Sequence, residues 1–401
     1  MLLDPDRCDS VAARNIAREV RRPDIAVTAR AGVRMRVGLL LWTVGNFYVF
    51  WRAWTVPLLA RRVPRWLLVA LAVLLYGSYF AARGLEGVLP PAVVSPLELV
   101  GADWMAVLFW SAAGLLIVDA VTAGGFLFRR WAPTARGGAL ALAGALAVIA
   151  VVQGTRAPVV RDYEVRLAGL PRDADGTVVV AISDLHLGTL IGERWLAARV
   201  RQVADLRPDA IVVLGDVLEG DTPSESGLLP ELRNLRAPLG VWAVNGNHEH
   251  YGRQGGRAGR LENAGFRMLV NQWAEVRPGL VFAGVEDLTR HGRGQTTVAD
   301  PIGQALAGRP ANAATVLLLH SPLQAERAAR GGVGLMLGAH THDGQIWPFG
   351  YFTARNYPLM GGRYDVNGMP AIVCRGTGTW GPRMRLWRPS EILRITLRST
   401  T

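Results

Sequence analysis

The stretch VVVAISDLH, residues 178–186, decides the fold of this chain. Its first five residues, Val178–Ile182, are apolar and mostly β-branched, which is typical of a buried strand. Asp184 and His186 follow directly, and both are residue types that bind divalent metals. Ligands bind at the carboxyl ends of strands in α/β sheets. The stretch therefore predicts a layered α/β domain with metal-binding side chains at the carboxyl end of a strand.

The same arrangement recurs four times toward the C-terminus. An apolar candidate strand precedes each of four polar clusters: GDVLE at 215–219, NGNHE at 245–249, His320, and GAHTH at 338–342. Amphipathic stretches between the strands predict helices. The predicted strands are Val178–Ser183, Ala210–Leu214, Val241–Val244, Leu280–Gly284, Thr315–Leu319, Gly334–Leu337 and Ala371–Cys374, and the predicted helices are Glu193–Asp205, Leu228–Leu235, Gly256–Ala264 and Leu323–Ala329.

Histidines gather in these clusters. Five of the seven histidines lie there, and only His250 and His291 lie elsewhere. A single histidine is more often structural than a ligand, but five at successive strand ends are hard to reach by chance. Residues two apart on an extended segment point to the same side, so Asp184 and His186 are expected to reach one pocket, as are the two histidines of GAHTH.

These residue types suit two divalent cations. Carboxylate, carboxamide and imidazole groups favour Mn, Fe or Zn over metals that prefer thiolates. A carboxylate has two oxygens and can bridge two metals, a task that suits Asp216. Two metals about 3.5–4 Å apart can activate a water and hold both ends of an in-line phosphoryl displacement.

Composition argues against several other classes of protein. The chain has 401 residues and a formal net charge of +12, and all of its basic residues are arginine. No basic run interleaved with aromatic residues stands out, so nucleic-acid binding is not favoured. Cys8 and Cys374 have no CxxC spacing, which argues against a disulfide framework and a thiolate metal site.

The apolar excess lies in the first 155 residues. Trp66–Ala82, Ala102–Phe128 and Gly137–Gly154 are long enough to cross a membrane, and Val37–Trp51 is either a fourth span or a re-entrant piece. We therefore predict a basic N-terminal arm (residues 1–36), an all-α transmembrane region of three or four helices (37–154) and an α/β domain (155–401). Asp119 is expected to face a protein interior and to pair with an arginine near a helix end.

The clusters resemble the Asp-x-His, Gly-Asp-x-x-Glu, Gly-Asn-His-Glu, His and His-x-His blocks of the calcineurin-like metallophosphoesterase superfamily, in the same order. The resemblance runs from about Val178 to the C-terminus. The segments GAHTHDGQIWP (338–348), RGTGTW (375–380) and RPSEI (388–392) resemble the membrane-anchored bacterial branch. The fold that this resemblance implies is a four-layer αββα sandwich, here preceded by the transmembrane region.

The resemblance also implies a role for each matching residue. His248 would touch the phosphoryl group and protonate or stabilise the leaving oxygen, and Glu249 would orient His248. Two divalent metal ions (Mn, Fe or Zn) are the implied cofactors. The implied ligands are Asp184, His186, Asp216 and His342 for the first metal, and Asp216, Asn247, His320 and His340 for the second.

Three positions depart from the pattern of the superfamily. Ala339 and Asp343 stand where glycine is common, and Glu219 stands where aspartate is common. None of these changes removes an implied ligand. We interpret Asp343 as a loop carboxylate rather than a weak metal ligand or a group that repels an anionic substrate, and we expect Glu219 to act without touching the metals.

The arginines predict an orientation in the plasma or inner membrane, because positive charge favours the cytoplasmic side. If Val37–Trp51 does not cross, the basic arm and the arginines at 52–65 and 129–136 lie inside, and only Arg83 lies outside. The α/β domain is then extracytoplasmic. If Val37–Trp51 crosses, the arginines at 52–65 and 129–136 lie outside, which fits the rule less well.

The sequence therefore predicts a membrane-bound hydrolase, a metallophosphoesterase acting on phosphate monoesters or, as a phosphodiesterase, on diesters. Membrane lipids and a phosphoester substrate are its expected partners, and both a lipid-linked and a soluble substrate remain open. Its C-terminal aromatic residues either line an apolar approach or belong to the core: Trp347, Phe349, Tyr351, Trp380 and Trp387.

Two other classes of protein are weighed against this prediction. A membrane sensor or scaffold with a catalytically idle phosphoesterase fold would be expected to lack one or more metal ligands, and no expected metal ligand is missing. A transporter would need more spans, or inverted repeats, than the sequence contains.

Overall fold

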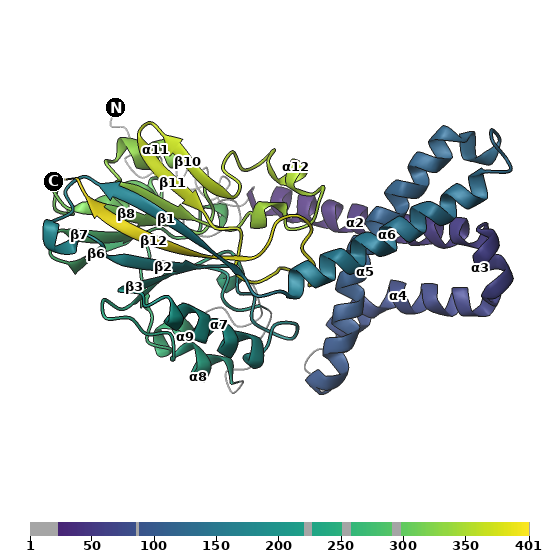
Figure 1. The fold of residues 1–401 in the computed structure, drawn as a ribbon, viewed down its shortest axis with the longest axis horizontal. Helices are drawn as coiled ribbons and strands as arrows, with labels where there is room; N and C mark the ends of the chain where they lie inside the picture. Colours follow the sequence, from purple (N-terminus) through teal and green to yellow (C-terminus); the bar gives the residue numbers. More distant parts are fainter. Residues whose placement is uncertain (1–22, 86–87, 220–226, 251–257, 291–297, 401) are drawn as a thin grey trace, which may run out of the picture.

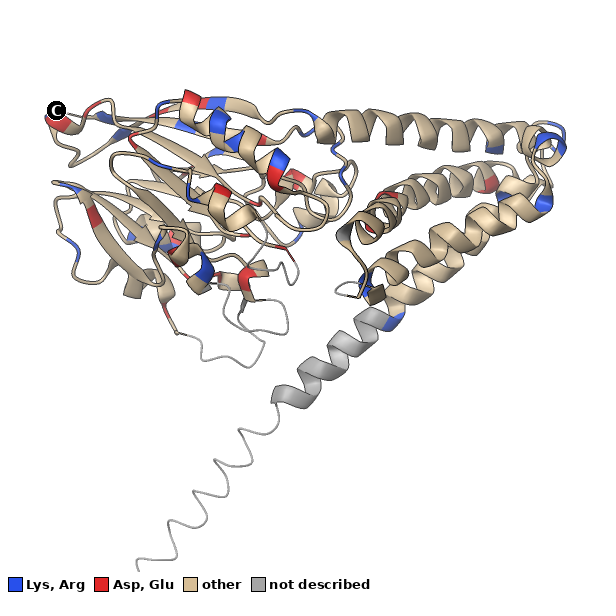
Figure 2. Cartoon of the chain, turned by 90° about the horizontal axis from the view of Figure 1, so that it is seen from below, with Lys and Arg blue, Asp and Glu red and all other residues tan. Residues whose placement is uncertain are grey.

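The computed structural model describes residues 23–85, 88–219, 227–250, 258–290 and 298–400. The N-terminal part consists of long helices, and the C-terminal part is built on two β-sheets (Figure 1). Figure 2 shows that charged residues gather on the two-sheet part and near the helix ends, while the long helices are mostly uncharged. The N-terminal helices are α2 (Pro23–Trp54), α3 (Pro57–Arg62), α4 (Arg65–Leu85), α5 (Pro91–Val121) and α6 (Ala132–Thr155).

Within the described residues, three helices are long and apolar enough to cross a membrane: α4, α5 and α6. This confirms three of the predicted segments, with one shift of bounds. The predicted segment Ala102–Phe128 is in fact helical from Pro91 to Val121. Glu98 breaks the uncharged pattern but lies 3.4 Å from Arg83 of α4, so the helix continues through it. Val37–Trp51 lies within α2, which is not one of the three.

Asp119 of α5 is paired as predicted. Its carboxylate lies 2.6 Å from Nε of Arg52, near the end of α2, and 2.8 Å from a guanidinium nitrogen of Arg136, near the start of α6. Tyr48 donates a third contact, at 2.7 Å. A charge at this depth needs such partners, and here they join three helices.

The C-terminal part contains two six-stranded sheets. Strands β2, β3, β4 and β5 of the first sheet are parallel, as are β7, β8, β9 and β11 of the second. In order across the first sheet, the strands are β1 (Val159–Leu167), β12 (Glu391–Ser399), β2 (Val178–Ile182), β3 (Ala210–Leu214), β4 (Val241–Val244) and β5 (Arg267–Met268). In the second they are β10 (Gly362–Val366), β11 (Met369–Val373), β9 (Leu335–Gly338), β8 (Ala314–Leu318), β7 (Leu280–Gly284) and β6 (Gln272–Arg277).

Helices cover both outer faces of the paired sheets. One apolar core lies between the sheets, with Val212 of β3 and Phe282 of β7 in it. A second core joins the first sheet to its helices, and a third does the same for the second sheet. The four-layer αββα sandwich is thus confirmed. Its outer helices are α7 (Glu193–Asp205), α8 (Leu228–Leu232) and α9 (Ala258–Asn263) on one side, and α10 (Pro301–Leu306) and α11 (Ala325–Arg330) on the other.

The membrane helices pack directly against the two-sheet part. The backbone N–H of Arg385 donates to the carbonyl of Ala150 in α6 at 2.9 Å. The backbone N–H of Arg383 donates to Asp103 of α5 at 2.8 Å. The short helix α12 (Gly350–Thr353) follows Phe349, whose ring lies 4.7 Å from that of Phe109 in α5.

Candidate metal centre

The predicted ligands come together at the carboxyl ends of strands from both sheets. The loops after β2, β3 and β4 approach from the first sheet, and those after β8 and β9 approach from the second. Parallel strands place these ends at one edge of each sheet. Six of the predicted ligands are buried and His340 is partly buried; the six are Asp184, His186, Asp216, Asn247, His320 and His342.

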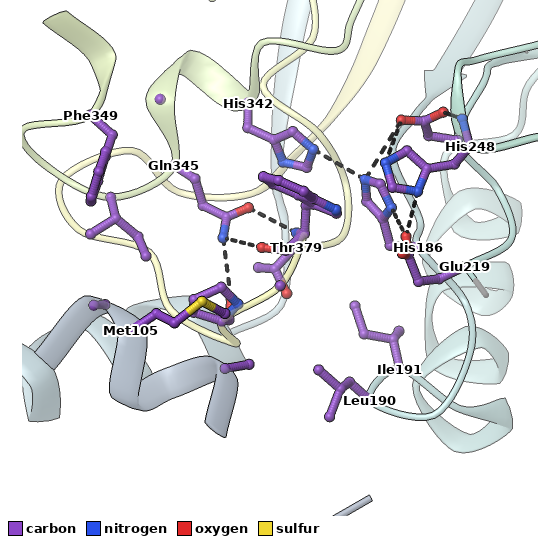
Figure 3. A pocket seen from close by; sticks show the side chains of 18 of the residues that line it. Met105, His186, Leu190, Ile191, Glu219, His248, His342, Gln345, Phe349 and Thr379 are labelled. Atoms are coloured by element: carbon purple, nitrogen blue, oxygen red, sulfur yellow. Dashed lines mark hydrogen bonds and ion pairs between the residues drawn. The ribbon is translucent and has the colours of Figure 1, made fainter. Parts of the chain in front are cut away.

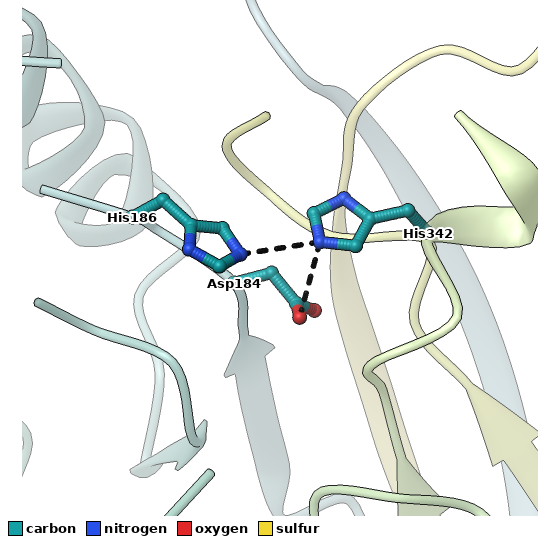
Figure 4. A group of neighbouring side chains, drawn as sticks. All are labelled: Asp184, His186 and His342. Atoms are coloured by element: carbon teal, nitrogen blue, oxygen red, sulfur yellow. Dashed lines mark hydrogen bonds and ion pairs between the residues drawn. The ribbon is translucent and has the colours of Figure 1, made fainter. Parts of the chain in front are cut away.

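Asp184, His186 and His342 form one group of ligand atoms, all within 4.8 Å of one another (Figure 4). Nε2 of His342 lies 3.2 Å from Nε2 of His186 and 3.3 Å from a carboxylate oxygen of Asp184. Asp184 is fully buried, and within the described part of the chain neither of its carboxylate oxygens has a hydrogen-bond partner. A buried carboxylate with so little solvation is costly unless it binds a cation.

Asp216, His320 and His340 form a second group within the same limit. Nε2 of His320 lies 3.1 Å from Asp216 and 3.0 Å from Nδ1 of His340. Nδ1 of His320 lies 2.7 Å from the carbonyl of Leu214, to which it must donate. That bond turns the Nε2 atom of His320 toward the cluster.

Asp216 lies between the two groups. It also belongs to a third set with His186 and His248, again within 4.8 Å. Its second carboxylate oxygen accepts the backbone N–H of His248 at 2.8 Å. Its other oxygen, Oδ2, is the atom that lies near the Nε2 atoms of His186, His248 and His320.

Burial and neighbouring charges shift the pKa values of both carboxylates, His340 and His342 toward the forms that bind metal, whereas the nearby carboxylates raise the pKa values of His186 and His320. Burial would raise the pKa of Asp184 and of Asp216, but the imidazoles around them outweigh it and lower both. Burial lowers the pKa of His340 to about 4 and also lowers that of His342. Ionised carboxylates and neutral imidazoles are the forms that bind metals.

Glu219 holds two of the histidines. One of its carboxylate oxygens lies 2.8 Å from Nδ1 of His186 and 2.8 Å from Nδ1 of His248 (Figure 3). Since a carboxylate accepts, both Nδ1 atoms carry the proton, and both Nε2 atoms are turned away from Glu219. Burial would raise the pKa of Glu219, but the two imidazoles outweigh it and lower the pKa to about 2.

Glu249 contacts the backbone instead of the His248 ring. Its carboxylate accepts the N–H groups of Gly246 and Val217 at 2.7 Å and of Asp216 at 2.9 Å. We predicted that Glu249 orients His248, but the carboxylate found against that ring is Glu219. Glu249 instead fixes two loops to each other, because three N–H groups from both loops converge on it.

The loop backbones differ from the extended segments that we expected. Residues Asp184, His186 and Asp216 have φ values of 48°, 45° and 53°, and His340 and His342 have 71° and 48°. The prediction of alternating side chains on an extended segment is therefore wrong. Left-handed turns bring the ligands together, and such backbone strain is common at functional sites.

Two glycines allow the loops to meet. A Cβ atom on Gly246 would lie 2.1 Å from the Asp216 carboxylate. A Cβ atom on Gly215 would lie 2.8 Å from Nδ1 of His320, and Gly215 has a φ of 84°. Both positions require glycine because a side chain would displace a predicted ligand.

Two contacts to the GAHTH histidines were not predicted from the sequence. The hydroxyl of Tyr357 lies 2.7 Å from Nε2 of His340. A guanidinium nitrogen of Arg385, which is fully buried, lies 3.3 Å from Nδ1 of His342 and donates at 2.8 Å to the carbonyls of Arg375 and Gly378. Arg385 lies 43 residues from His342, so no motif spacing connects the two.

Asp343 is held by arginines, as expected for a loop carboxylate. It lies 3.0 Å from Arg375 and 3.2 Å from Arg388. Burial raises its pKa even so. The two arginines account for its charge without a metal.

Comparisons with known proteins identify the family of the two-sheet part. Residues 177–344 match the family model for calcineurin-like phosphoesterases. A Danio rerio protein named transmembrane protein with metallophosphoesterase domain is 31% identical over 65% of this chain and 62% of its own length. An uncharacterized metallophosphoesterase of Aquifex aeolicus is 32% identical over 60% of this chain and 91% of its own length.

Coverage of the relatives is uneven. The chain matches 62% of the Danio rerio protein and 60% of a Bos taurus protein of the same name. A solved structure described as a dimetal phosphatase from Danio rerio matches 51% of this chain with a TM-score of 0.35 and 13% identity.

Proposed function

Because this chain belongs to the calcineurin-like metallophosphoesterase family, we propose that it hydrolyses phosphate mono- or diesters with two divalent metal ions at the membrane. The observation that carries the proposal is the convergence of two carboxylates, Asp184 and Asp216, and five histidines, with Asp216 in two of the three groups that they form. The buried carboxylate of Asp184, whose oxygens have no hydrogen-bond partner among the described residues, and the imidazoles turned by Glu219 and Leu214 fit such cations.

The first metal would be held by Asp184, His186, Asp216 and His342, and the second by Asp216, Asn247, His320 and His340. When bound, the two metals would withdraw charge from the phosphoryl group and lower the pKa of the attacking water. Mn, Fe and Zn all suit these ligands.

His248 would act on the leaving group. Glu219 holds its Nδ1 proton, and its Nε2 atom lies 4.0 Å from Asp216, toward the metal groups. As water adds to phosphorus and the P–O ester bond breaks, a protonated Nε2 would donate its proton to the leaving oxygen. Its ring lies in the wall of a cavity that is also lined by five of the proposed ligands, His186, Asp216, Asn247, His340 and His342.

The membrane helices and the arginine distribution support an integral protein of the plasma or inner membrane with the two-sheet part outside the cytoplasm. That position favours a substrate resident in the membrane, including a lipid-linked one, over a soluble phosphoester.

The purified full-length chain, stripped of metal and reloaded with Mn, Fe or Zn, tests the function. We expect turnover of p-nitrophenyl phosphate or bis(p-nitrophenyl) phosphate that appears with metal and disappears with a chelator. Stoichiometric metal binding without turnover of any ester would favour the catalytically idle scaffold instead.

A further inference from the structure

A single cavity connects the metal groups with the membrane helices. Its volume is about 800 Å³. At one end lie the imidazoles of His186, His248 and His342, and at the other lie Met105 and Ala102 of α5. Figure 3 shows Met105 and Phe349 across the cavity from Leu190 and Ile191, with the histidines at its inner end.

The size of the cavity exceeds what a phosphate group requires. Pockets of about 300–1,000 Å³ enclose most of the surface of a ligand of drug size, and a phosphoryl group alone would leave most of this volume empty. The lining away from the metal groups is largely apolar and includes Leu190, Ile191, Ile346 and Phe349. The remaining space therefore suits an apolar chain attached to the phosphate.

The charges on the part of the cavity wall that the membrane helices form are balanced. Among the described lining residues, Arg83 is the one arginine or lysine, and it is paired with Glu98 at 3.4 Å. Both residues lie near the helix ends that face the two-sheet part. This wall has no net charge to attract a second anionic group, and its chemistry favours hydrocarbon.

Exposed aromatic residues lie on the segments that contact α5 and α6. Trp347, Tyr351 and Trp387 are 48%, 71% and 55% exposed, so of the two alternatives these three do not belong to the core. Trp110 of α5 donates to the carbonyl of Trp347 at 2.9 Å. Trp380, which is 56% exposed, also lines the cavity. Exposed tryptophan and tyrosine next to membrane helices are typical of the lipid–water interface.

We propose that the cavity binds an amphiphilic phosphoester, with its phosphate at the metal groups and its hydrocarbon chain against Met105 and the facing Leu190. The proposal rests on the proposed function for the position of the phosphate. It adds that α5, a membrane helix, forms part of the substrate site, so that an ester could enter from the lipid without leaving apolar surroundings.

Binding of non-hydrolysable alkylphosphonates to the full-length, metal-loaded protein in nanodiscs tests the proposal. Each methylene buried against an apolar wall is expected to tighten binding by up to about fourfold. We expect the affinity to rise by about tenfold or more from methyl- to hexylphosphonate, since even partial burial of five methylenes gives that gain. Calorimetry reports this affinity whether or not the protein turns over an ester.

Matched variants test where the alkyl chain of the phosphonate binds. Met105→Trp narrows the cavity and should remove most of the gain with chain length. Leu116→Trp, on an exposed position of α5 outside the lining, should keep it. Leu190→Gln changes the facing wall from another element and should act like Met105→Trp if the helix variant does not fold.

The outcomes separate the two proposals. A gain with chain length that Met105→Trp or Leu190→Gln reduces, and Leu116→Trp does not, supports the amphiphile site even if no ester is hydrolysed. Equal affinity for methyl- and hexylphosphonate overturns it, even if p-nitrophenyl esters are turned over. If all three variants keep the increase in affinity with chain length, the alkyl chain lies in the surrounding lipid. That result also overturns the proposed amphiphile site.

Discussion

Glu219→Gln is the substitution that most directly tests how the metal groups are held. In the structure, one carboxylate oxygen accepts Nδ1–H groups from His186 and His248, both at 2.8 Å. The amide keeps the shape of the side chain but loses the charge. Its oxygen can still accept, and its NH₂ group cannot.

The loss can be estimated from these two contacts. A hydrogen bond to a charged group contributes about 1.5–3 kcal/mol, and a neutral one about half as much. Replacing the carboxylate by an amide should therefore cost about 1.5–3 kcal/mol over the two bonds. Because about 1.4 kcal/mol is a factor of ten, we expect metal affinity to fall roughly 10- to 100-fold, which is the usual range for groups that orient histidine ligands.

Competition with a chromophoric chelator would measure the affinity, and thermal unfolding of the metal-free protein would check the fold. Glu219→Asp is the matched control, because it keeps the charge on a shorter side chain. It should lose less affinity than Glu219→Gln. Metal affinity within twofold of the parent in Glu219→Gln, or a larger loss in Glu219→Asp, would refute the reasoning.

Four other outcomes are expected. Asp216→Ala should remove both metals and essentially all turnover; a full metal complement by elemental analysis would exclude the bridging role. His248→Asn should keep metal but lower kcat by about 10²–10⁴-fold, more for esters with poor leaving groups; equal loss across graded leaving groups together with metal depletion would contradict the acid role. Arg385→Met leaves two short carbonyl contacts unmade, so it should destabilise the protein by roughly 3 kcal/mol or more; an unchanged Tm in detergent would contradict this. A reporter fused after Thr401 that works only outside the cytoplasm should be active; activity of a cytoplasmic reporter alone would reverse the orientation.

The strands that sequence predicted best are buried on both faces. β3 (Ala210–Leu214), β4 (Val241–Val244) and β7 (Leu280–Gly284) have the predicted bounds, because each is an apolar run with all residues covered. β1 (Val159–Leu167) and β12 (Glu391–Ser399) were missed. Arginines and acids interrupt both, because β1 forms the edge of the first sheet and β12 lies next to it, so neither is a continuous apolar run.

The residue types of the site could be predicted from the sequence, but the residues that hold them in position could not. Each ligand follows a strand, and strand ends are visible in the sequence. The partner of the His248 ring was assigned to its neighbour Glu249, yet Glu219, 29 residues earlier, holds it. Sequence proximity is a poor guide here because left-handed turns at Asp216 and the adjacent glycine redirect the loops.

The change from apolar helices to the two-sheet part near residue 155 is visible in the composition. The membrane helices and the metal centre are nevertheless connected across this boundary. A Cβ atom on Gly154, the second-last residue of α6, would lie 2.6 Å from the carbonyl of Arg383. Arg383 and Arg385 are both bound through their backbones to membrane helices, and the Arg385 side chain contacts His342. One loop therefore carries contacts from α5 and α6 to a predicted metal ligand. A hydropathy average separates the two parts because it depends only on the side chains. The contacts that join them are made by backbone atoms, which do not contribute to that average. The membrane helices are thus part of the support of the metal centre as well as an anchor.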